Sequence, residues 1–514
     1  MHQKRWERWL LLVLLLTLAV VPNGTNDAAA EGGNESLPVT SVCVGQDDHN
    51  RLACYLARGE APEPSWAERL LPLVQAAERD EARVGLMVYD MDTGRYYAYN
   101  AQTLLAPAST IKLLVAAAAL DTLGPQYRFR TTVAHDGEWS LNGELHGNLI
   151  LKGYGDPTLT TETLAGWAAT LAERGLRAVT GDVLLDVSFF GEGSGTAVQG
   201  WRFDDPQPSV GALSVNHNQI RLSVTPGAAT SAPAVIQVEP TLPALVVRNL
   251  VVTAEAGNRA TLKWRAGEDG GLTVEGRIPL GARAVQKQAT AQSPALYVGE
   301  LFGQLLARHG VAFGETTQVR SATMPDGAQP LIEGRSEPLR RVLPDMLKRS
   351  DNFISEQMLR ALGGETFGHG DGETGRQAVA RFLENAGLSA LPYVLCDGCG
   401  LRLDNELSAE LLVGLLVFMH DHPHGPVFRD ALAVAGVDGT LARRLRDTAA
   451  HRQVRAKTGS LLGASALAGY ITPPDGRTLA FAILMNGPAA HGWSWVDAMR
   501  RLQDDIVLEM LSCR

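Results

Sequence analysis

A serine and a lysine three residues apart are the first candidates for chemistry in this sequence. Ser109 and Lys112 lie directly before a run of Ala and Leu, and Pro107 suits the first turn of a helix, so we expect a helix to begin at about Pro107. Residues three apart share a helix face, which brings the Lys112 amine within reach of the Ser109 hydroxyl. If burial or a nearby cation keeps Lys112 neutral, the pair can act as a nucleophile and its general base.

Two short motifs further along the chain support this hypothesis. They are Ser350-Asp351-Asn352 and Lys457-Thr458-Gly459. The sequences Ser-x-x-Lys, Ser-Asp-Asn and Lys-Thr-Gly, in this order, are the three motifs of penicillin-binding proteins and class A β-lactamases. The chain therefore resembles serine enzymes that form a covalent acyl intermediate.

Four further segments resemble signatures of one family of penicillin-binding proteins. They are Gly-Asp-Pro-Thr-Leu at 155–159, Asn-His-Asn at 216–218, Asp-Gly-Cys-Gly-Leu at 397–401 and Ala-Gly-Val-Asp-Gly-Thr-Leu at 435–441. The family is the class C, low-molecular-mass group of D-alanyl-D-alanine carboxypeptidases and endopeptidases, and the resemblance covers nearly the whole mature chain. It implies an α/β (α+β) fold, in which a serine-transferase domain of antiparallel sheet and helices is interrupted by a β-rich insertion.

The resemblance also implies the catalytic roles. Ser109 would attack the carbonyl between two D-alanines, and Lys112 would accept its proton. Ser350 would relay a proton to the leaving amine. Asn352 would hydrogen-bond Lys112 and the substrate amide, while Lys457 would supply a positive field that keeps Lys112 neutral. No metal and no cofactor are implied.

The same resemblance implies a set of substrate-binding residues. They are Thr458, Gly459, Ser460, Asp204, Asp205 and Arg402. Thr458 and Ser460 would receive the terminal carboxylate of the substrate, and the backbone N–H groups of Ser109 and Ser460 would hold the oxyanion. Asp204 and Asp205 would contact the free amine of the stem peptide.

Arg402 marks a departure from the family pattern. After Asp-Gly-x-Gly-Leu the family usually continues with Ser-Arg, whereas this chain continues with Arg402-Leu403-Asp404. The family's arginine helps to position the peptide stem. Either Arg402 does so from a shifted place or the stem contact differs, and the acyl chemistry is the same in both cases.

The elements that must position these residues follow from the hydrophobic patterns. Helical spacing predicts helices at 65–78, 295–309, 339–350 and 493–511, with a further helix directly after Ser350-Asp351-Asn352. Strand patterns predict a hairpin of 84–90 and 96–100 and three strands at 454–461, 466–472 and 478–485. Ser350 would then lie in a break between two helices, and Lys457 on a strand at the edge of a cleft.

The predicted domains follow the changes in these patterns. They are a signal peptide at 1–30, an amino-terminal extension at 31–64, a transpeptidase-like catalytic domain at 65–126 and 287–514, and an inserted region of one or two β-rich subdomains at 127–286. The insertion is predicted from short alternating runs that are separated by Gly, Pro and Asp.

The amino terminus has the pattern of a targeting segment. Lys4, Arg5 and Arg8 precede an apolar run at 10–21, and three alanines at 28–30 offer small residues for cleavage. An uncleaved anchor is the alternative, because the polar stretch before the cleavage site is long. We expect an exported protein, in the periplasm or elsewhere outside the cytoplasmic membrane, and peripheral membrane association stays open.

The net charge limits the classes of binding partner, and the cysteines suggest which disulfides can form. A net charge of −10 over 514 residues argues against a nucleic-acid partner. The resemblance instead implies peptidoglycan stem peptides as substrates and β-lactam antibiotics as inhibitors. A Cys43–Cys54 bridge is preferred in an exported chain. Cys396 and Cys399 are interpreted as small buried residues or as a local disulfide rather than as a redox or zinc pair.

Three functions remain open at this stage. The first is a penicillin-sensitive serine peptidase that trims or cuts peptidoglycan peptides. The second is a β-lactamase, which shares the motifs but usually has Ser-x-x-Lys and Ser-Asp-Asn closer together in the sequence. The third is a non-catalytic wall-binding module, which is disfavoured because every polar position of the motifs is present.

Overall fold

The computed structural model describes residues 42–46, 67–191, 200–204, 207–242, 244–267 and 270–512. The predicted signal peptide at 1–30, most of the extension at 31–64 and Asp205 lie outside the described residues. The preferred Cys43–Cys54 bridge also lies outside them, because Cys54 is not described.

A seven-stranded sheet forms the centre of the catalytic domain, in the order β1-β3-β2-β25-β24-β23-β22. Its strands are β1 (Val42–Gln46), β2 (Arg83–Asp90), β3 (Arg95–Tyr99), β22 (Ala433–Val434), β23 (Val454–Leu461), β24 (Ala464–Ile471) and β25 (Leu479–Asn486). Every neighbouring pair in this sheet is antiparallel. Leu86 and Val88 alternate with Met87 and Tyr89 along β2, and all four are buried, so both faces of the sheet are covered.

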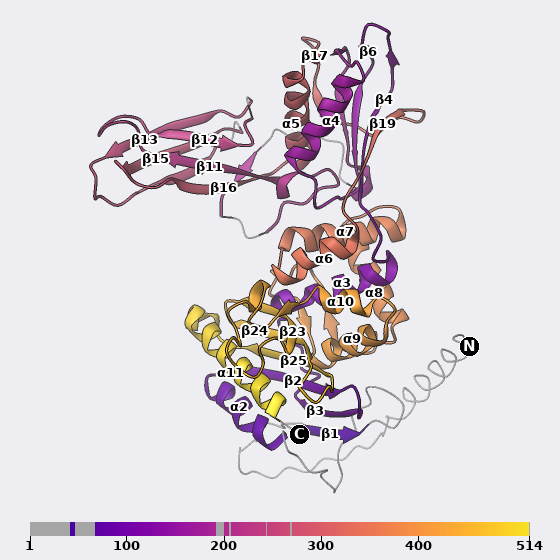
Figure 1. The fold of residues 1–514 in the computed structure, drawn as a ribbon, viewed down its shortest axis with the longest axis vertical. Helices are drawn as coiled ribbons and strands as arrows, with labels where there is room; N and C mark the ends of the chain where they lie inside the picture. The colour runs from indigo at the N-terminus through magenta and orange to yellow at the C-terminus, as the bar shows by residue number, and fades with distance from the viewer. Residues whose placement is uncertain are drawn as a thin grey trace, which may run out of the picture.

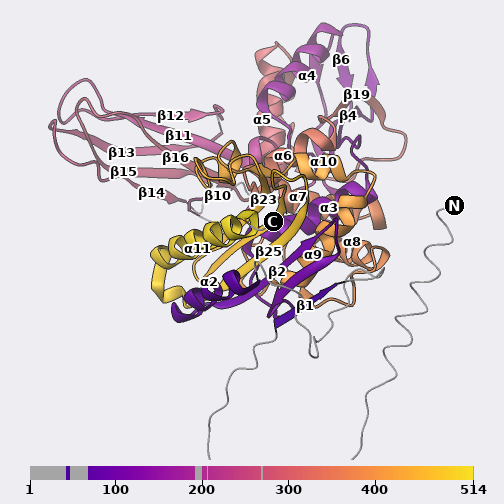
Figure 2. The ribbon, with the colours of Figure 1, turned by 60° about the horizontal axis from the view of Figure 1, so that its bottom comes forward.

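Helices cover the two faces (Figures 1 and 2). On one face, α2 (Ala67–Arg79) and α11 (Gly492–Ser512) form a hydrophobic cluster with Leu86 and Val88. On the other face, Met87 and Tyr89 belong to a larger cluster. The catalytic-domain helices that contribute apolar residues to this cluster are α3 (Lys112–Thr122), α6 (Leu339–Lys348), α7 (Asn352–Phe367), α8 (Gly372–Asn385), α9 (Ala409–Asp421) and α10 (Gly425–Asp430). All residues of α3 from Lys112 to Leu120 are buried, so α3 runs through the middle of this layer.

The insertion consists of two β-rich subdomains, which lie above the catalytic domain in Figure 1. The first contains β4 (Arg130–His135), β5 (Glu138–Trp139), β6 (Glu144–His146), β7 (Leu149–Gly153), α4 (Thr161–Glu173), β8 (Ala178–Val179), β9 (Val183–Asp186), α5 (Pro294–Arg308), β17 (Ala312–Phe313), β18 (Val319–Ser321) and β19 (Gln329–Arg335). The second contains β10 (Trp201–Arg202), β11 (Gln219–Thr225), β12 (Val235–Glu239), β13 (Val247–Ala254), β14 (Lys263–Ala266), β15 (Leu272–Pro279) and β16 (Val285–Ala291).

The insertion ends later than residue 286, where we predicted its boundary. Strand β18 pairs with β9, and β19 pairs with β4, so the chain returns to the catalytic domain only after Arg335. The helix that we predicted at 295–309 exists as α5, but it packs against α4 of the insertion. An apolar helix face predicts that a helix is packed without telling which layer it packs on, and the prediction of residues 287–335 as catalytic domain was wrong for that reason.

Most other elements near the motifs are as predicted. The β2–β3 hairpin, the strands β23 to β25 and the helix pair α6 and α7 lie within a few residues of the expected ranges. One detail differs. Ala108–Ile111 form a 3₁₀ turn, and the α-helix begins at Lys112 rather than at about Pro107. Both the N–H and the hydroxyl of Thr110 donate to the Pro107 carbonyl, and this i to i+3 pattern is that of a 3₁₀ turn.

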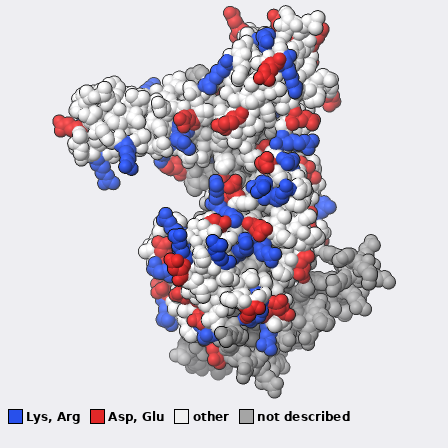
Figure 3. All heavy atoms as spheres, in the orientation of Figure 1, with Lys and Arg blue, Asp and Glu red and all other residues white. Residues whose placement is uncertain are grey.

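The visible surface carries charges of both signs. Figure 3 shows Lys and Arg side chains interspersed with Asp and Glu on this face. Within the described residues, no helix combines the length and the apolar character that a membrane crossing requires.

Candidate active site

Ser109 lies in the 3₁₀ turn before α3, between strand β23 and the loop at 398–400. Two glycines allow this close packing. A Cβ atom at Gly459 would lie 2.5 Å from the Pro107 carbonyl oxygen, and one at Gly400 would lie 2.0 Å from the Ala108 carbonyl oxygen. Gly400 also has a φ of +81°, which L side chains rarely adopt. The Gly positions of two motifs therefore bring strand and loop against the turn that carries Ser109.

Lys112 is fully buried and makes three polar contacts. Its Nζ lies 2.8 Å from Ser109 Oγ, 2.9 Å from Asn352 Oδ1 and 2.5 Å from the Cys399 carbonyl oxygen. A neutral amine has two N–H donors and one lone pair. The amide oxygen and the carbonyl oxygen accept the two N–H groups, which leaves the lone pair for the Ser109 hydroxyl.

Burial is the main cause that favours the neutral form of Lys112. It lowers the pKa of Lys112 to about 8, while nearby acidic groups, Cys399, Asp397, Glu356 and Asp351, act in the opposite direction. We predicted that the charge of Lys457 would lower this pKa, but burial lowers it and Lys457 is not among the groups that shift it. The fully buried Lys457 has its own pKa lowered well below the usual value, first by burial and then by the charge of Lys112.

Ser350 and Lys457 form the second half of the site. Ser350 lies between α6 and α7 with a φ of +62°, an uncommon conformation that aims its side chain at β23. Lys457 Nζ donates to Ser350 Oγ at 2.8 Å and to the Thr458 carbonyl oxygen at 2.8 Å. Asp351 caps α7 by accepting the Ile354 N–H at 2.9 Å, which fixes where Asn352 starts the helix.

The strand beside Ser109 has a polar edge. Thr458 Oγ1 lies 2.8 Å from Thr440 Oγ1. Ser460 Oγ accepts from Arg500 of α11, at 2.8 Å from Nη2 and 3.3 Å from Nε. Strand β22 pairs only with Arg455 and Ala456, so in the described part of the chain the rest of this edge of β23 has no neighbouring strand.

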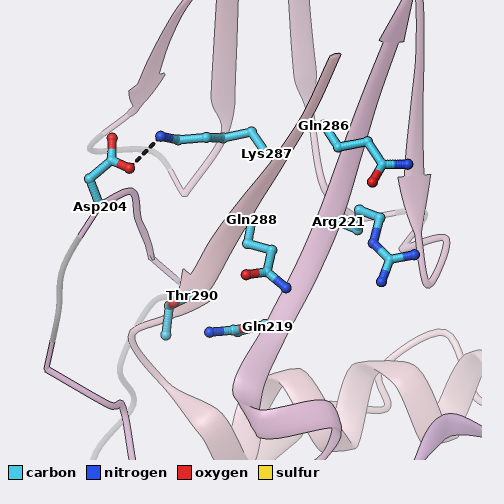
Figure 4. A pocket seen from close by; sticks show the side chains of 7 residues that line it. All are labelled: Asp204, Gln219, Arg221, Gln286, Lys287, Gln288 and Thr290. Atoms are coloured by element: carbon cyan, nitrogen blue, oxygen red, sulfur yellow. Dashed lines mark hydrogen bonds and ion pairs between the residues drawn. The ribbon is translucent and has the colours of Figure 1, made fainter. Parts of the chain in front are cut away.

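The structure thus brings all three motifs together. Two residues that were predicted to bind the stem peptide, Asp204 and Arg402, instead pair with other side chains of the protein. Asp204 forms an ion pair with Lys287 at a pocket of the second insertion subdomain (Figure 4). The other residues that line this pocket are Gln219, Arg221, Gln286, Gln288 and Thr290. The exposed Arg402 donates to both carboxylate oxygens of Asp404, at 2.9 Å from Nε and 2.5 Å from Nη2. Their substrate contacts stay predictions.

Sequence reasoning missed several residues that border the site. Arg500 contacts Ser460, and Glu356 accepts the Gly398 N–H, so the partners of both residues lie about 40 positions away in the sequence. Asp397 accepts backbone N–H groups of its own loop. One signal was available, because Glu356 follows Asn352 by one helical turn. Cys396 and Cys399 are both free thiols, so the alternative of a local disulfide between them was wrong.

Comparison with known proteins decides the family. The family model of the D-Ala-D-Ala carboxypeptidase 3 (S13) family matches residues 68–505. The chain belongs to this family. A D-alanyl-D-alanine carboxypeptidase of Actinomadura sp. (strain R39) is 34% identical over 420 residues, 78% of this chain and 77% of the relative. Carboxypeptidase DacB of Mycolicibacterium smegmatis is 30% identical over 534 residues, 97% of this chain and 98% of the relative.

A solved structure agrees with these relatives. The crystal structure of penicillin binding protein 4 (dacB) from Haemophilus influenzae matches with a TM-score of 0.70 and 26% identity, and the match covers 81% of this chain and 93% of that chain. The comparisons confirm the predicted family and fold. They also confirm that the protein is a serine carboxypeptidase.

Proposed function

We propose that this S13 chain hydrolyses peptidoglycan stem peptides that end in D-Ala-D-Ala, and cross-linked peptides of the same kind, through an acyl-enzyme on Ser109. The observation that carries the proposal is the Ser109–Lys112 contact of 2.8 Å, with Lys112 buried and two other acceptors, Asn352 Oδ1 and the Cys399 carbonyl, within hydrogen-bond distance of its Nζ. The serine and its base are thus in place before substrate binds.

Each bond change has a residue beside it. Ser109 Oγ attacks the carbonyl carbon between the D-alanines and gives its proton to Lys112, and the backbone N–H groups of Ser109 and Ser460 bind the oxyanion. The C–N bond then breaks, and the leaving amine takes a proton through Ser350, whose Oγ contacts Lys457. Water cleaves the ester, which releases the shortened peptide and frees Ser109.

The proposal also covers inhibition by β-lactams and the location of the protein. A β-lactam places an amide carbonyl in the same position, so we propose that it acylates Ser109 and inhibits the enzyme, as the name of the H. influenzae relative suggests. The substrate lies outside the cytoplasmic membrane. We therefore propose that the chain is exported by its amino-terminal segment, and that peripheral contact with the membrane is compatible with this role.

A turnover experiment separates the peptidase from a β-lactamase. In the described residues, Ser109 Oγ contacts Lys112 and the Cys399 carbonyl, and no carboxylate contacts it that could activate water for rapid release of a penicilloyl group. We expect the penicilloyl-enzyme to persist for minutes or longer, while a peptide ending in D-Ala-D-Ala turns over and releases D-alanine. Many turnovers of nitrocefin per second, with no D-alanine released, would overturn the peptidase in favour of the β-lactamase.

The position of Arg500 leads to a second prediction, which concerns binding of the substrate's terminal carboxylate. Its guanidinium contacts Ser460 Oγ and also Asp497 Oδ1 at 2.6 Å, so it places positive charge behind the predicted carboxylate site. Because hydrogen bonds to charged groups contribute about 1.5–3 kcal/mol, Arg500→Gln should lower kcat/KM for a peptide with a free carboxylate by about tenfold or more. For the same peptide with a terminal D-alaninamide, which has no carboxylate, Arg500→Gln should change kcat/KM little.

The control for this prediction is the neighbouring exposed arginine. Arg501→Gln removes a positive charge from the next residue of α11 and should leave kcat/KM unchanged for both substrates. Equal losses on the free acid and the amide in Arg500→Gln would show that Arg500 supports the strand without recognising the carboxylate.

A further inference from the structure

Glu356 of α7 connects the site to a loop that the three motifs do not include. It lies one helical turn after Asn352, on the same side of α7. Its Oε1 accepts two backbone N–H groups, from Gly398 at 2.7 Å and from Cys399 at 2.9 Å. One carboxylate oxygen therefore holds two consecutive peptide units of the loop at 398–400.

This loop carries the carbonyl group that contacts the catalytic pair. The Cys399 carbonyl oxygen lies 2.5 Å from Lys112 Nζ and 3.4 Å from Ser109 Oγ. Ser355, the residue before Glu356, donates from its hydroxyl to the Gly398 carbonyl oxygen at 2.6 Å. The same turn of α7 thus holds the loop through both a donor and an acceptor.

Asp397 fixes the other side of the loop. Its Oδ1 accepts the Gly400 N–H at 2.6 Å, and its Oδ2 accepts the Arg402 N–H at 2.8 Å. Asp397 and Cys399 are buried, and burial followed by the charge of Asp397 raises the pKa of Glu356. Acidic groups are costly in such a place, and these are held by hydrogen bonds from the backbone of the loop.

The position of the Cys399 carbonyl matters because it selects the direction of the Lys112 lone pair. Asn352 Oδ1 accepts one N–H of the neutral amine, and the Cys399 carbonyl accepts the other. If this carbonyl moves away, the amine is free to rotate, and its second N–H can point at Ser109 Oγ in place of the lone pair. A base in that orientation cannot take the serine proton.

We propose that Glu356 is a positioning residue for the general base, which holds the Cys399 carbonyl on Lys112 and so directs the lone pair of Lys112 at Ser109. The inference rests on the proposed function, in which Lys112 is the base. It adds a residue outside the three motifs whose loss should reduce the rate of acylation without removing any group that touches the substrate.

A metal site is the alternative use of these groups. Ligand atoms of Glu356, Asp397 and Cys399 lie within 4.8 Å of one another. Glu356 Oε1 and both oxygens of Asp397 already accept backbone N–H groups, however, and Lys112 contacts the same loop. This use of the carboxylates favours a role in holding the loop.

The closing experiment compares two substitutions of Glu356. Glu356→Gln keeps an Oε1 that can accept both N–H groups but removes the charge, whereas Glu356→Ala removes both. The rate of acylation by benzylpenicillin is measured as a function of pH. We expect the plateau rate to fall at least about tenfold in Glu356→Ala, a part of the hundredfold or more that a positioned base supplies, and to stay within about threefold in Glu356→Gln.

The pH profile provides a readout that a purely structural role would not change. The groups that face Lys112 are Glu356, Asp397, Asp351 and the Cys399 thiol, which raise its pKa, and the buried amine of Lys457 beyond Ser350, whose own pKa is lowered by burial. Removing the negative charge in Glu356→Gln should therefore shift the acid limb of the profile to lower pH. Glu410→Gln, which changes a buried carboxyl group of α9, is the matched control and should leave the limb unchanged.

The outcomes are distinct. If the wild type forms no adduct on Ser109, the proposed function itself fails. If the wild type is acylated but Glu356→Ala reacts at the same rate, or if Glu356→Gln is as slow as Glu356→Ala or keeps an unshifted limb, the positioning role is overturned. If Glu356→Ala does not fold, Glu356→Asp, whose carboxylate is one methylene shorter, takes its place with the same expected loss.

Discussion

Replacing Ser109 with alanine should abolish the covalent adduct that benzylpenicillin forms with this protein. Ser109 is the hydroxyl group that contacts the buried Lys112 amine, and it lies where the 3₁₀ turn meets strand β23. Without its Oγ there is no oxygen to form the ester, so the loss is complete rather than partial. Intact-mass measurement after incubation should show one adduct on the wild type and none on Ser109→Ala.

A control variant tests whether a serine-to-alanine substitution elsewhere in the protein also prevents formation of the adduct. Ser188 is an exposed serine of the first insertion subdomain, and Ser188→Ala should form the adduct as the wild type does. An adduct that survives in Ser109→Ala would mean that another residue is acylated, and the mechanism would then have to be rebuilt around that residue.

The contact between Ser109 and Lys112 could be predicted from the sequence because it joins two residues at a short spacing. Ser109 and Lys112 meet within one turn, and this contact follows from helical geometry alone. The contacts of Asn352 with Lys112 and of Lys457 with Ser350 depend on the fold, and the resemblance to penicillin-binding proteins was needed to predict them. The strands were predictable because their apolar runs are buried on both faces of one sheet.

Other features depend on tertiary contacts that no local pattern records. The helix α5 has a clear apolar face, but only the pairing of β18 and β19 shows that it belongs to the insertion. Arg402 pairs with Asp404 two residues away, an interaction that the departure from the family pattern did not reveal. Glu356 could be placed on the Asn352 side of a helix, while its partners at Gly398 and Cys399 could not.

Replacing Lys112 with alanine should slow acylation at least about a hundredfold, the usual contribution of a positioned general base. The wild-type rate should rise with pH around a midpoint of about 8, because burial lowers the pKa of Lys112 to that value. Only the neutral amine accepts a proton, so the rate falls as pH drops below this pKa and is constant well above it. Lys112→Ala should lose this dependence together with the rate.

The comparison is made by stopped-flow or quenched acylation over a range of pH, with Lys263→Ala as control because Lys263 is exposed on the insertion. Lys457 is the rival base, since it is also buried and burial lowers its pKa as well. Its Nζ contacts Ser350 Oγ, and in the proposed mechanism Ser350 passes a proton to the leaving amine. Acylation of Lys112→Ala at nearly the wild-type rate, with the acid limb intact, would transfer the role of base to Lys457 acting through Ser350.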